Sequence, residues 1–292
     1  MGSCSTTRCP FLTAFPAGFA EMNALDIVRM DPLQLKNLAL GLLLVQARLM
    51  PMFLLLPMMN RAMVPRTVLF AIAAGFGALV LPILHVPTDW GKDAGLLLLI
   101  LSKEAFVGLL LGFLLALPFW LFEAVGFMVD NQRGANMAAM LNPLTGSESS
   151  PLGLLMNMAF ITLYISIGGM QVLLGVVYDS YKLWNPLEFW PDLGVSFADL
   201  VFPQLNRMLQ HCLLLAAPAM LVMLLAELSL ALISRFAPQL QVFFLAMPIK
   251  SALGIFILAI SAGMLLDIAQ EHMNAGRHWL QWLAPAMSGG LE

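Results

Sequence analysis

Five ionisable side chains lie inside long apolar stretches of the sequence: Arg48, Lys103, Glu104, Glu227 and Lys250. A charge at the centre of a membrane helix costs about 2.5–3.5 kcal/mol on insertion scales, so five charges facing lipid would cost roughly 12–18 kcal/mol. That cost exceeds the stability of a typical domain. Most of these groups must therefore face protein, water or each other.

Two kinds of chemistry fit such charges, and the residues alone leave both open. The charges can be paired structural groups inside a helix bundle, or some of them can line an aqueous pathway. In the second case, a stand-alone secondary transporter could use Glu104, Glu227 and Lys250 as a coupling site. Enzyme chemistry has little support, because the sequence contains no HExxH, GxSxG or phosphate-loop motif. We therefore expect no catalytic residues.

Metal, cofactor and nucleic-acid sites are not expected either. Cys4, Cys9 and Cys212 form no CxxC motif and no cysteine–histidine cluster. The formal net charge of −3 does not favour a nucleic-acid partner.

The elements that must position the charges are membrane helices. Of the 292 residues, 60% are hydrophobic and only 11% are charged, and the mean hydropathy is +0.87. Soluble domains are about 45–50% apolar and about 25% charged. We therefore predict an all-α integral membrane protein surrounded by lipid.

Six apolar segments predict about six long helices, partly kinked and arranged as hairpins. Pro118, Pro218 and Pro248 are the candidate kinks. A polar and aromatic linker is expected at residues 178–207. The six segments are residues 38–57, 67–84, 95–122, 151–177, 208–233 and 240–266. Residues 22–275 are expected to form a single helical domain, with an N-terminal extension at 1–21 and a C-terminal tail at 276–292.

The spacing of small residues predicts where helices pack closely. Glu104, Gly108 and Gly112 recur every four residues and share one helix face. Their GxxxG motif lets two helices approach closely, so we expect this face to pack on another helix or chain. A similar stripe lies in the sixth segment: Lys250, Gly254 and Ser261.

Two polar stretches interrupt the apolar pattern. DNQRGANMAAMLNP, at residues 130–143, predicts a helix end with an i,i+3 ion pair between Asp130 and Arg133, followed by an Asn-Pro turn. SRFAPQL, at residues 234–240, predicts a hairpin tip between the fifth and sixth segments, with charges that contact a partner.

Two longer motifs resemble the signatures of a known family. They are KEAFVGLLLGFLLALPFWLFEAVGFMVDNQRGANMAAMLNP at residues 103–143 and AELSLALISRFAPQLQVFFLAMPIKSA at residues 226–252. Both resemble the T subunit of type III secretion export gates, of the injectisome branch more than of its flagellar counterpart, the R subunit of the flagellar gate. The resemblance covers roughly residues 34–270.

The resemblance implies a pore-forming, structural subunit in the bacterial inner membrane, at the base of the secretion system. One copy would join several copies of two smaller hydrophobic subunits, of R and S type, in a helical assembly around a conduit for unfolded secreted proteins. Other export-apparatus subunits and the needle or inner rod would be its neighbours. The energy for transport would come from elsewhere in the machine.

The resemblance also implies that the loop after the third helical region helps to plug the closed pore, near residues 137–150. The implied plug residues are Met137, Met140, Leu141, Asn142, Pro143, Leu144 and Gly146. The polar motif before the plug comprises Glu123, Asp130, Gln132, Arg133 and Gly134. The residues expected in subunit packing or buried charge pairing are Arg48, Lys103, Glu104, Gly108, Gly112, Glu227, Arg235, Pro238, Gln239, Pro248 and Lys250.

Overall fold

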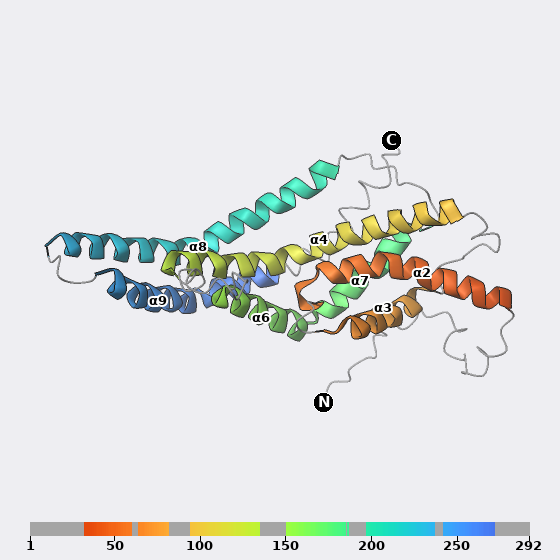
Figure 1. The fold of residues 1–292 in the computed structure, drawn as a ribbon, viewed down its shortest axis with the longest axis horizontal. Coiled ribbons are helices and arrows are strands. Elements are labelled where there is room, and N and C mark those ends of the chain that lie inside the picture. Colours follow the sequence, from red (N-terminus) through yellow and green to blue (C-terminus); the bar gives the residue numbers. More distant parts are fainter. Residues whose placement is uncertain are drawn as a thin grey trace, which may run out of the picture. The chain divides into compact units, whose positions relative to one another are not determined.

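All the regular structure that is described is helical (Figure 1). The computed structural model describes residues 32–59, 64–81, 94–134, 150–184, 186, 197–236 and 242–271. Among these residues, three helices are long and apolar enough to cross a membrane, or up to five spans exist if each bent pair of helices counts as one. The predicted all-α membrane fold is confirmed, with a number of spans that roughly matches the expected six.

The chain divides into two compact units, which we describe separately. The first comprises Met1–Pro51 and Pro65–Gly108, and the second comprises Met52–Val64 and Leu109–Glu292. The predicted N-terminal extension at residues 1–21 and C-terminal tail at residues 276–292 lie outside the described residues, so these boundaries stay predictions.

The first unit is built from most of α2 (Pro32–Leu55), from α3 (Arg66–Val80) and from the beginning of α4 (Ala94–Arg133). The apolar part of α3 covers only Arg66–Ala78, which is shorter than a membrane span. Over its described residues the second predicted segment is therefore a helix, and its apolar part is shorter than a membrane span.

Close backbone contact holds the first unit together. A Cβ atom added at Gly108 of α4 would overlap the carbonyl oxygen of Arg48 in α2. A Cβ atom at Gly77 of α3 would lie 3.2 Å from Cγ1 of Val45, also in α2. The side chains of Val45 and Leu49 have no exposed surface. The face predicted from Gly108 does pack on another helix, and that helix belongs to the same chain.

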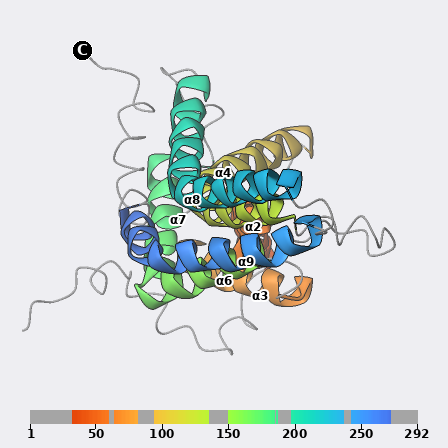
Figure 2. The same cartoon turned by 90° about the vertical axis from the view of Figure 1, so that its left-hand side faces the viewer.

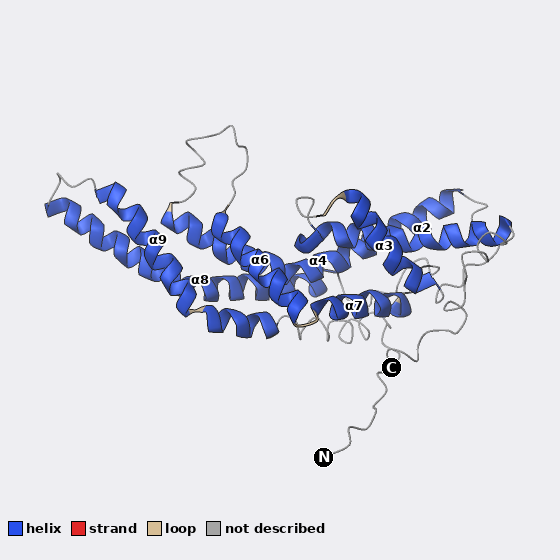
Figure 3. Cartoon of the chain, turned by 90° about the horizontal axis from the view of Figure 1, so that it is seen from below, coloured by secondary structure: helices blue, strands red, loops and turns tan. Residues whose placement is uncertain are grey.

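The second unit contains the rest of α4 and a long hairpin. The hairpin consists of α8 (Phe197–Phe236) and α9 (Val242–Ile260), which run antiparallel and side by side (Figures 1, 2 and 3). This arrangement confirms the hairpin predicted around residues 234–240. Its tip at residues 237–241, which includes Pro238 and Gln239, lies outside the described residues.

The predicted fourth segment is not one straight span. It forms α6 (Pro151–Ser166) and α7 (Gly169–Leu183), which meet at a bend of 77°. Gly168 has φ +84, a left-handed conformation that favours glycine. A Cβ atom at Gly169 would lie 2.5 Å from the ring of Tyr164, so that the ring packs directly over the backbone of the bend.

A kink of the expected kind occurs in the sixth segment, although not at Pro248, and the predicted linker has other bounds. The sixth segment bends by 54° at Ser261, between Leu245–Ile260 and Ala262–Glu271. The linker predicted at residues 178–207 is shorter, because α7 continues to Leu183 and α8 begins at Phe197. Tyr181 and Trp184 are buried, which explains why α7 continues beyond Tyr178: the aromatic residues of this stretch pack against the protein.

We predict that Gly108→Leu lowers the yield of folded protein severalfold. A leucine there must displace the backbone of Arg48, and overpacking of this kind typically costs about 1–3 kcal/mol. The measurement is the monodisperse peak of a fluorescent fusion protein in detergent. Gly95→Leu in the same helix is the matched control, because a Cβ atom at Gly95 meets nothing within 4 Å. Equal yields from the two variants would contradict the close packing of α4 on α2.

Candidate functional site

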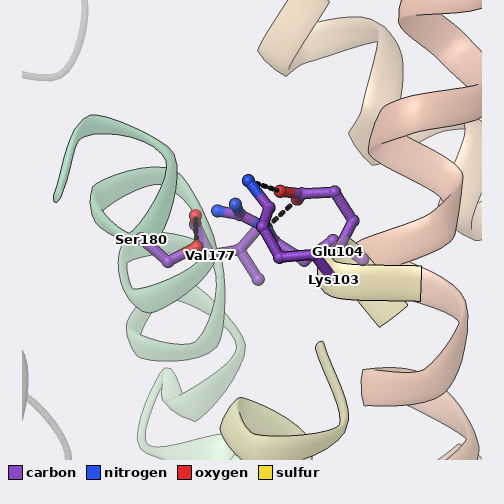
Figure 4. A network of polar contacts seen from close by, with 5 residues as sticks. Lys103, Glu104, Val177 and Ser180 are labelled. Carbon is purple, nitrogen blue, oxygen red and sulfur yellow. Dashed lines mark hydrogen bonds and ion pairs between the residues drawn. The ribbon is translucent and has the colours of Figure 1, made fainter. Parts of the chain in front are cut away.

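The first unit contains a buried cluster of three charges. Nε of Arg48 in α2 donates to Oε2 of Glu104 in α4 at 2.6 Å, and Nζ of Lys103 lies 3.0 Å from Oε1 of the same carboxylate. Figure 4 shows the ammonium group of Lys103 pointing at the Glu104 carboxylate. The exposed fraction is 8% for Lys103, 1% for Arg48 and 0% for Glu104.

The position of this cluster follows from the glycine one helical turn later. Gly108 brings the α4 backbone against the backbone of Arg48, so the guanidinium group reaches Glu104 on the same face of α4. Two cations share one carboxylate, which gives the cluster a formal charge of +1. A carboxylate removed from water needs such partners, because burying an ion without them is very costly.

The second unit pairs the remaining two charges of the sequence. Nζ of Lys250 in α9 lies 2.9 Å from Oε2 of Glu227 in α8. Lys250 is buried, whereas the Glu227 side chain is 51% exposed. A Cβ atom at Gly254, one turn after Lys250, would lie 3.0 Å from Sδ of Met223 in α8. The ion pair and the glycine therefore sit where α9 packs on α8.

The two carboxylates of the suggested coupling site lie in different units. Glu104 belongs to the first unit and Glu227 to the second, and each has a basic partner of its own. All five charges within apolar segments are thus in ion pairs. The structural alternative predicts such pairing, and a role for any of these charges in an aqueous pathway stays a prediction.

A second buried carboxylate joins the end of α4 to the start of α6. Asp130 has no exposed surface. Its Oδ2 accepts the backbone N–H of Leu152 at 2.9 Å and the hydroxyl of Ser150 at 2.5 Å. Its Oδ1 lies 2.6 Å from Nη2 of Arg133, which is the predicted i,i+3 ion pair. Ser150 is also the N-cap of α6, since its Oγ accepts the N–H of Gly153.

Two further layers hold the same pair of helices together. A Cβ atom at Gly126 of α4 would lie 2.5 Å from Cα of Gly153 in α6, so the two backbones touch. Nδ2 of Asn157 donates to Oε2 of Glu123 at 2.9 Å. We call the three layers formed by Asp130, Gly126 and Glu123 with α6 the α4–α6 interface.

An aromatic cluster continues this interface away from the helix ends. Phe119 of α4 makes edge contacts with the rings of Phe160 and Tyr164 in α6, at centroid distances of 4.9 and 5.2 Å. Phe122 stacks on Phe160 at 4.5 Å. Residues 119–130 of α4 therefore pair with residues 150–164 of α6 in antiparallel order, as the ribbons in Figure 1 show.

The structure brings together most of the polar motif predicted after the third segment. Glu123 and Asp130 belong to the α4–α6 interface, and Arg133 pairs with Asp130 in the last turn of α4. Gly134 ends α4 with φ +82, and its N–H donates to the carbonyl of Asn131. Gln132 is half-buried.

For the remaining predicted positions that are described, the structure gives the helix, the exposure or a neighbouring backbone. Arg235 is exposed in the last turn of α8, and Pro248 lies inside α9. Gly112 lies against the backbone of Met52 in the second unit. The implied plug residues, Met137, Met140, Leu141, Asn142, Pro143, Leu144 and Gly146, lie outside the described residues.

Four residues of the α4–α6 interface were not predicted: Gly126, Ser150, Gly153 and Asn157. Two of them carried a signal in the sequence. Ser150 precedes a proline at the first helical position, which is typical of a helix N-terminus. Gly126 lies four residues before Asp130 on the same helix face. Nothing local marks Asn157, because its partner Glu123 lies 34 residues away.

Comparison with known proteins gives consistent matches over most of the chain. The sequence model of the family described as Bacterial export proteins, family 1 matches residues 39–276. "Yop proteins translocation protein T" of Yersinia pestis is 40% identical over 227 residues, which cover 77% of this chain and 87% of that protein. "Surface presentation of antigens protein SpaR" of Shigella flexneri is 35% identical, with 73% and 81% covered. "Flagellar biosynthetic protein FliR" of Bacillus subtilis is 25% identical, with 78% and 88% covered.

We predict that Glu104→Gln destabilises the protein by about 3–5 kcal/mol, because it removes the carboxylate that two buried cations share. Lys103→Met is the matched control: it keeps the ion pair between Arg48 and Glu104 and should cost clearly less. The measurement is unfolding by sodium dodecyl sulfate, followed by circular dichroism. A Glu104→Gln variant as stable as the wild type would mean that the cluster does not hold α2 to α4.

Proposed function

The chain belongs to family 1 of the bacterial export proteins, and from this membership we propose that it is a structural subunit of the export gate of a type III secretion system in the bacterial inner membrane. The observation that carries the proposal is the similarity to the Yersinia translocation protein over most of both chains. The higher identity to the secretion proteins than to the flagellar protein supports the injectisome branch.

The lengths of the helices support a large assembly. Helices α4 and α8 have 40 residues each, which corresponds to about 60 Å at 1.5 Å per residue. The hydrocarbon core of a bilayer is only about 30 Å thick. Even a strongly tilted helix of this length extends beyond the lipid core, so its apolar outer surface needs another cover.

The outer surface of α8 is apolar along much of its length. Leu221, Leu225 and Leu232 are each more than half exposed in the isolated chain. The half-exposed carboxylate of Glu227 lies on the same helix, and hydrocarbon is a poor environment for it. We propose that the two smaller hydrophobic subunits, of R and S type, cover such surfaces in a complex that contains one copy of this chain.

We also propose that residues 137–150 help to plug the conduit for unfolded secreted proteins. The family resemblance carries this proposal. The described helices on either side support it, since the end of α4 and the start of α6 are fixed to each other by Asp130. A plug needs fixed ends if the chain between them is to occupy the same place in every closed gate.

Co-expression with the candidate R and S subunits tests membership in the gate. We expect the chain to leave the membrane in a large complex of fixed stoichiometry, because its exposed apolar helices are covered by those subunits. The measurement is size-exclusion chromatography with native mass spectrometry. A chain that purifies alone and catalyses solute flux in vesicles would instead be a secondary transporter, and the proposal would fail.

Deletion of residues 138–147 tests the plug. We expect the gate to assemble normally and the inner membrane to leak ions, because the barrier across the conduit is shortened. The measurement is ion conductance in cells that express the complete gate. Replacing the same ten positions with glycine and serine is the matched control for loop length, and it should leak as well, because it removes the apolar seal. An assembled deletion variant with wild-type conductance would exclude these residues as the barrier.

A further inference from the structure

We infer that Asp130 is a positioning residue that ties the last turn of α4 to the first turn of α6, and thereby holds together the two ends of residues 135–149. The consequence for transport rests on the proposed function. The tie itself depends only on described residues, so the two can be tested separately.

The Asp130 carboxylate is shared between two helices. One oxygen accepts two hydrogen bonds from α6, from the Ser150 hydroxyl and the Leu152 N–H, and the other contacts Arg133 in the last turn of α4. A negative charge at a helix N-terminus and a positive charge at a helix C-terminus both interact favourably with the helix dipoles. Asp130 is thus favourably placed at the start of α6, and Arg133 offsets the charge of Asp130 at the end of α4.

Burial makes the tie specific for a carboxylate. Asp130 has no exposed surface, so water cannot replace a lost partner. An asparagine offers one acceptor oxygen, and its NH2 group would point at a donor on one side or the other. Asp130→Asn therefore keeps the bonds to α6 or the contact with Arg133, and cannot keep both.

The adjacent glycine contact makes the tie specific for side-chain length. Gly126 and Gly153 bring the backbones of α4 and α6 into contact one turn away from Asp130. The space for a side chain at position 130 is therefore fixed by the backbone. A glutamate there would carry one methylene group more than this space allows, so charge alone does not satisfy the site.

The same helix face provides a matched control. Glu123 lies two turns before Asp130 and accepts one hydrogen bond, from Asn157. Glu123→Gln removes a negative charge from the same face of α4, yet keeps an oxygen that can accept that bond. If the effect of Asp130→Asn came from charge alone, the two variants would behave alike.

The experiment is a distance measurement between spin labels in the complete co-expressed gate. The labels are placed at exposed positions of α4 and α6, through Phe127→Cys and Leu155→Cys, in a chain whose three native cysteines are alanine. Double electron–electron resonance then gives the distribution of distances. Ion conductance and the yield of complex are measured for the same variants.

We expect one narrow distribution for the unmodified interface and for Glu123→Gln. Asp130→Asn should add a second population at longer distance, whose share is roughly tenfold or more above that in the wild type, because the bonds from α6 are then either lost or accepted by a neutral amide in place of a carboxylate. Asp130→Glu should do the same. If Asp130→Asn does not assemble, Ser150→Ala removes one of the two bonds to α6 and should still broaden the distribution.

The outcomes separate the inference from the proposed function. A narrow distribution in the assembled Asp130 variants, or in Ser150→Ala when they do not assemble, overturns the inference. A broadened distribution with increased conductance at unchanged yield supports both the tie and the plug. A broadened distribution with wild-type conductance supports the tie and counts against the plug.

Discussion

Ionised side chains without access to water determine how the helices of this protein pair. Glu104 and Asp130 have no exposed surface, and each receives donors from two different helices. A helix in lipid gains little from burying apolar side chains against another helix, because lipid is equally apolar. Specific polar contacts and close backbone packing must therefore select the partner and fix the register.

Charge and glycine occur together in three places, always one helical turn apart. Glu104 precedes Gly108, Gly126 precedes Asp130, and Lys250 precedes Gly254. In each case, a Cβ atom at the glycine would meet the neighbouring helix at 3.0 Å or less, and the charged group forms an ion pair or hydrogen bond with that helix. At Gly108 and Gly126 the two backbones touch, and at Gly254 the glycine makes room for the side chain of Met223, so in each place the helices lie close enough for the charged side chain to reach its partner. The two units thus use one device at helix pairs that are far apart in sequence.

How much of the fold could be predicted from the sequence depended on whether a contact joins neighbouring or distant residues. Local features were predictable: the helix face of Glu104 and Gly108, the ion pair of Asp130 with Arg133, and the all-α class. Contacts between distant residues were not, because nothing in the sequence tells that Arg48 pairs with a residue 56 positions later or that Asp130 caps the next helix. The bend at Gly168 and Gly169 was missed for a related reason. It depends on the ring of Tyr164 packing over the backbone, whereas hydrophobicity alone continues through it.

The central claim is that buried carboxylates hold specific helix pairs together, and a double-mutant cycle on Arg48 and Glu104 tests it most directly. The free energies of unfolding in detergent are compared for Arg48→Met, Glu104→Gln and the double variant. We predict a coupling energy of about 0.5–3 kcal/mol, with the double variant more stable than the sum of the single losses implies. Strictly additive losses would show that the two residues do not act as a pair, and would contradict the account.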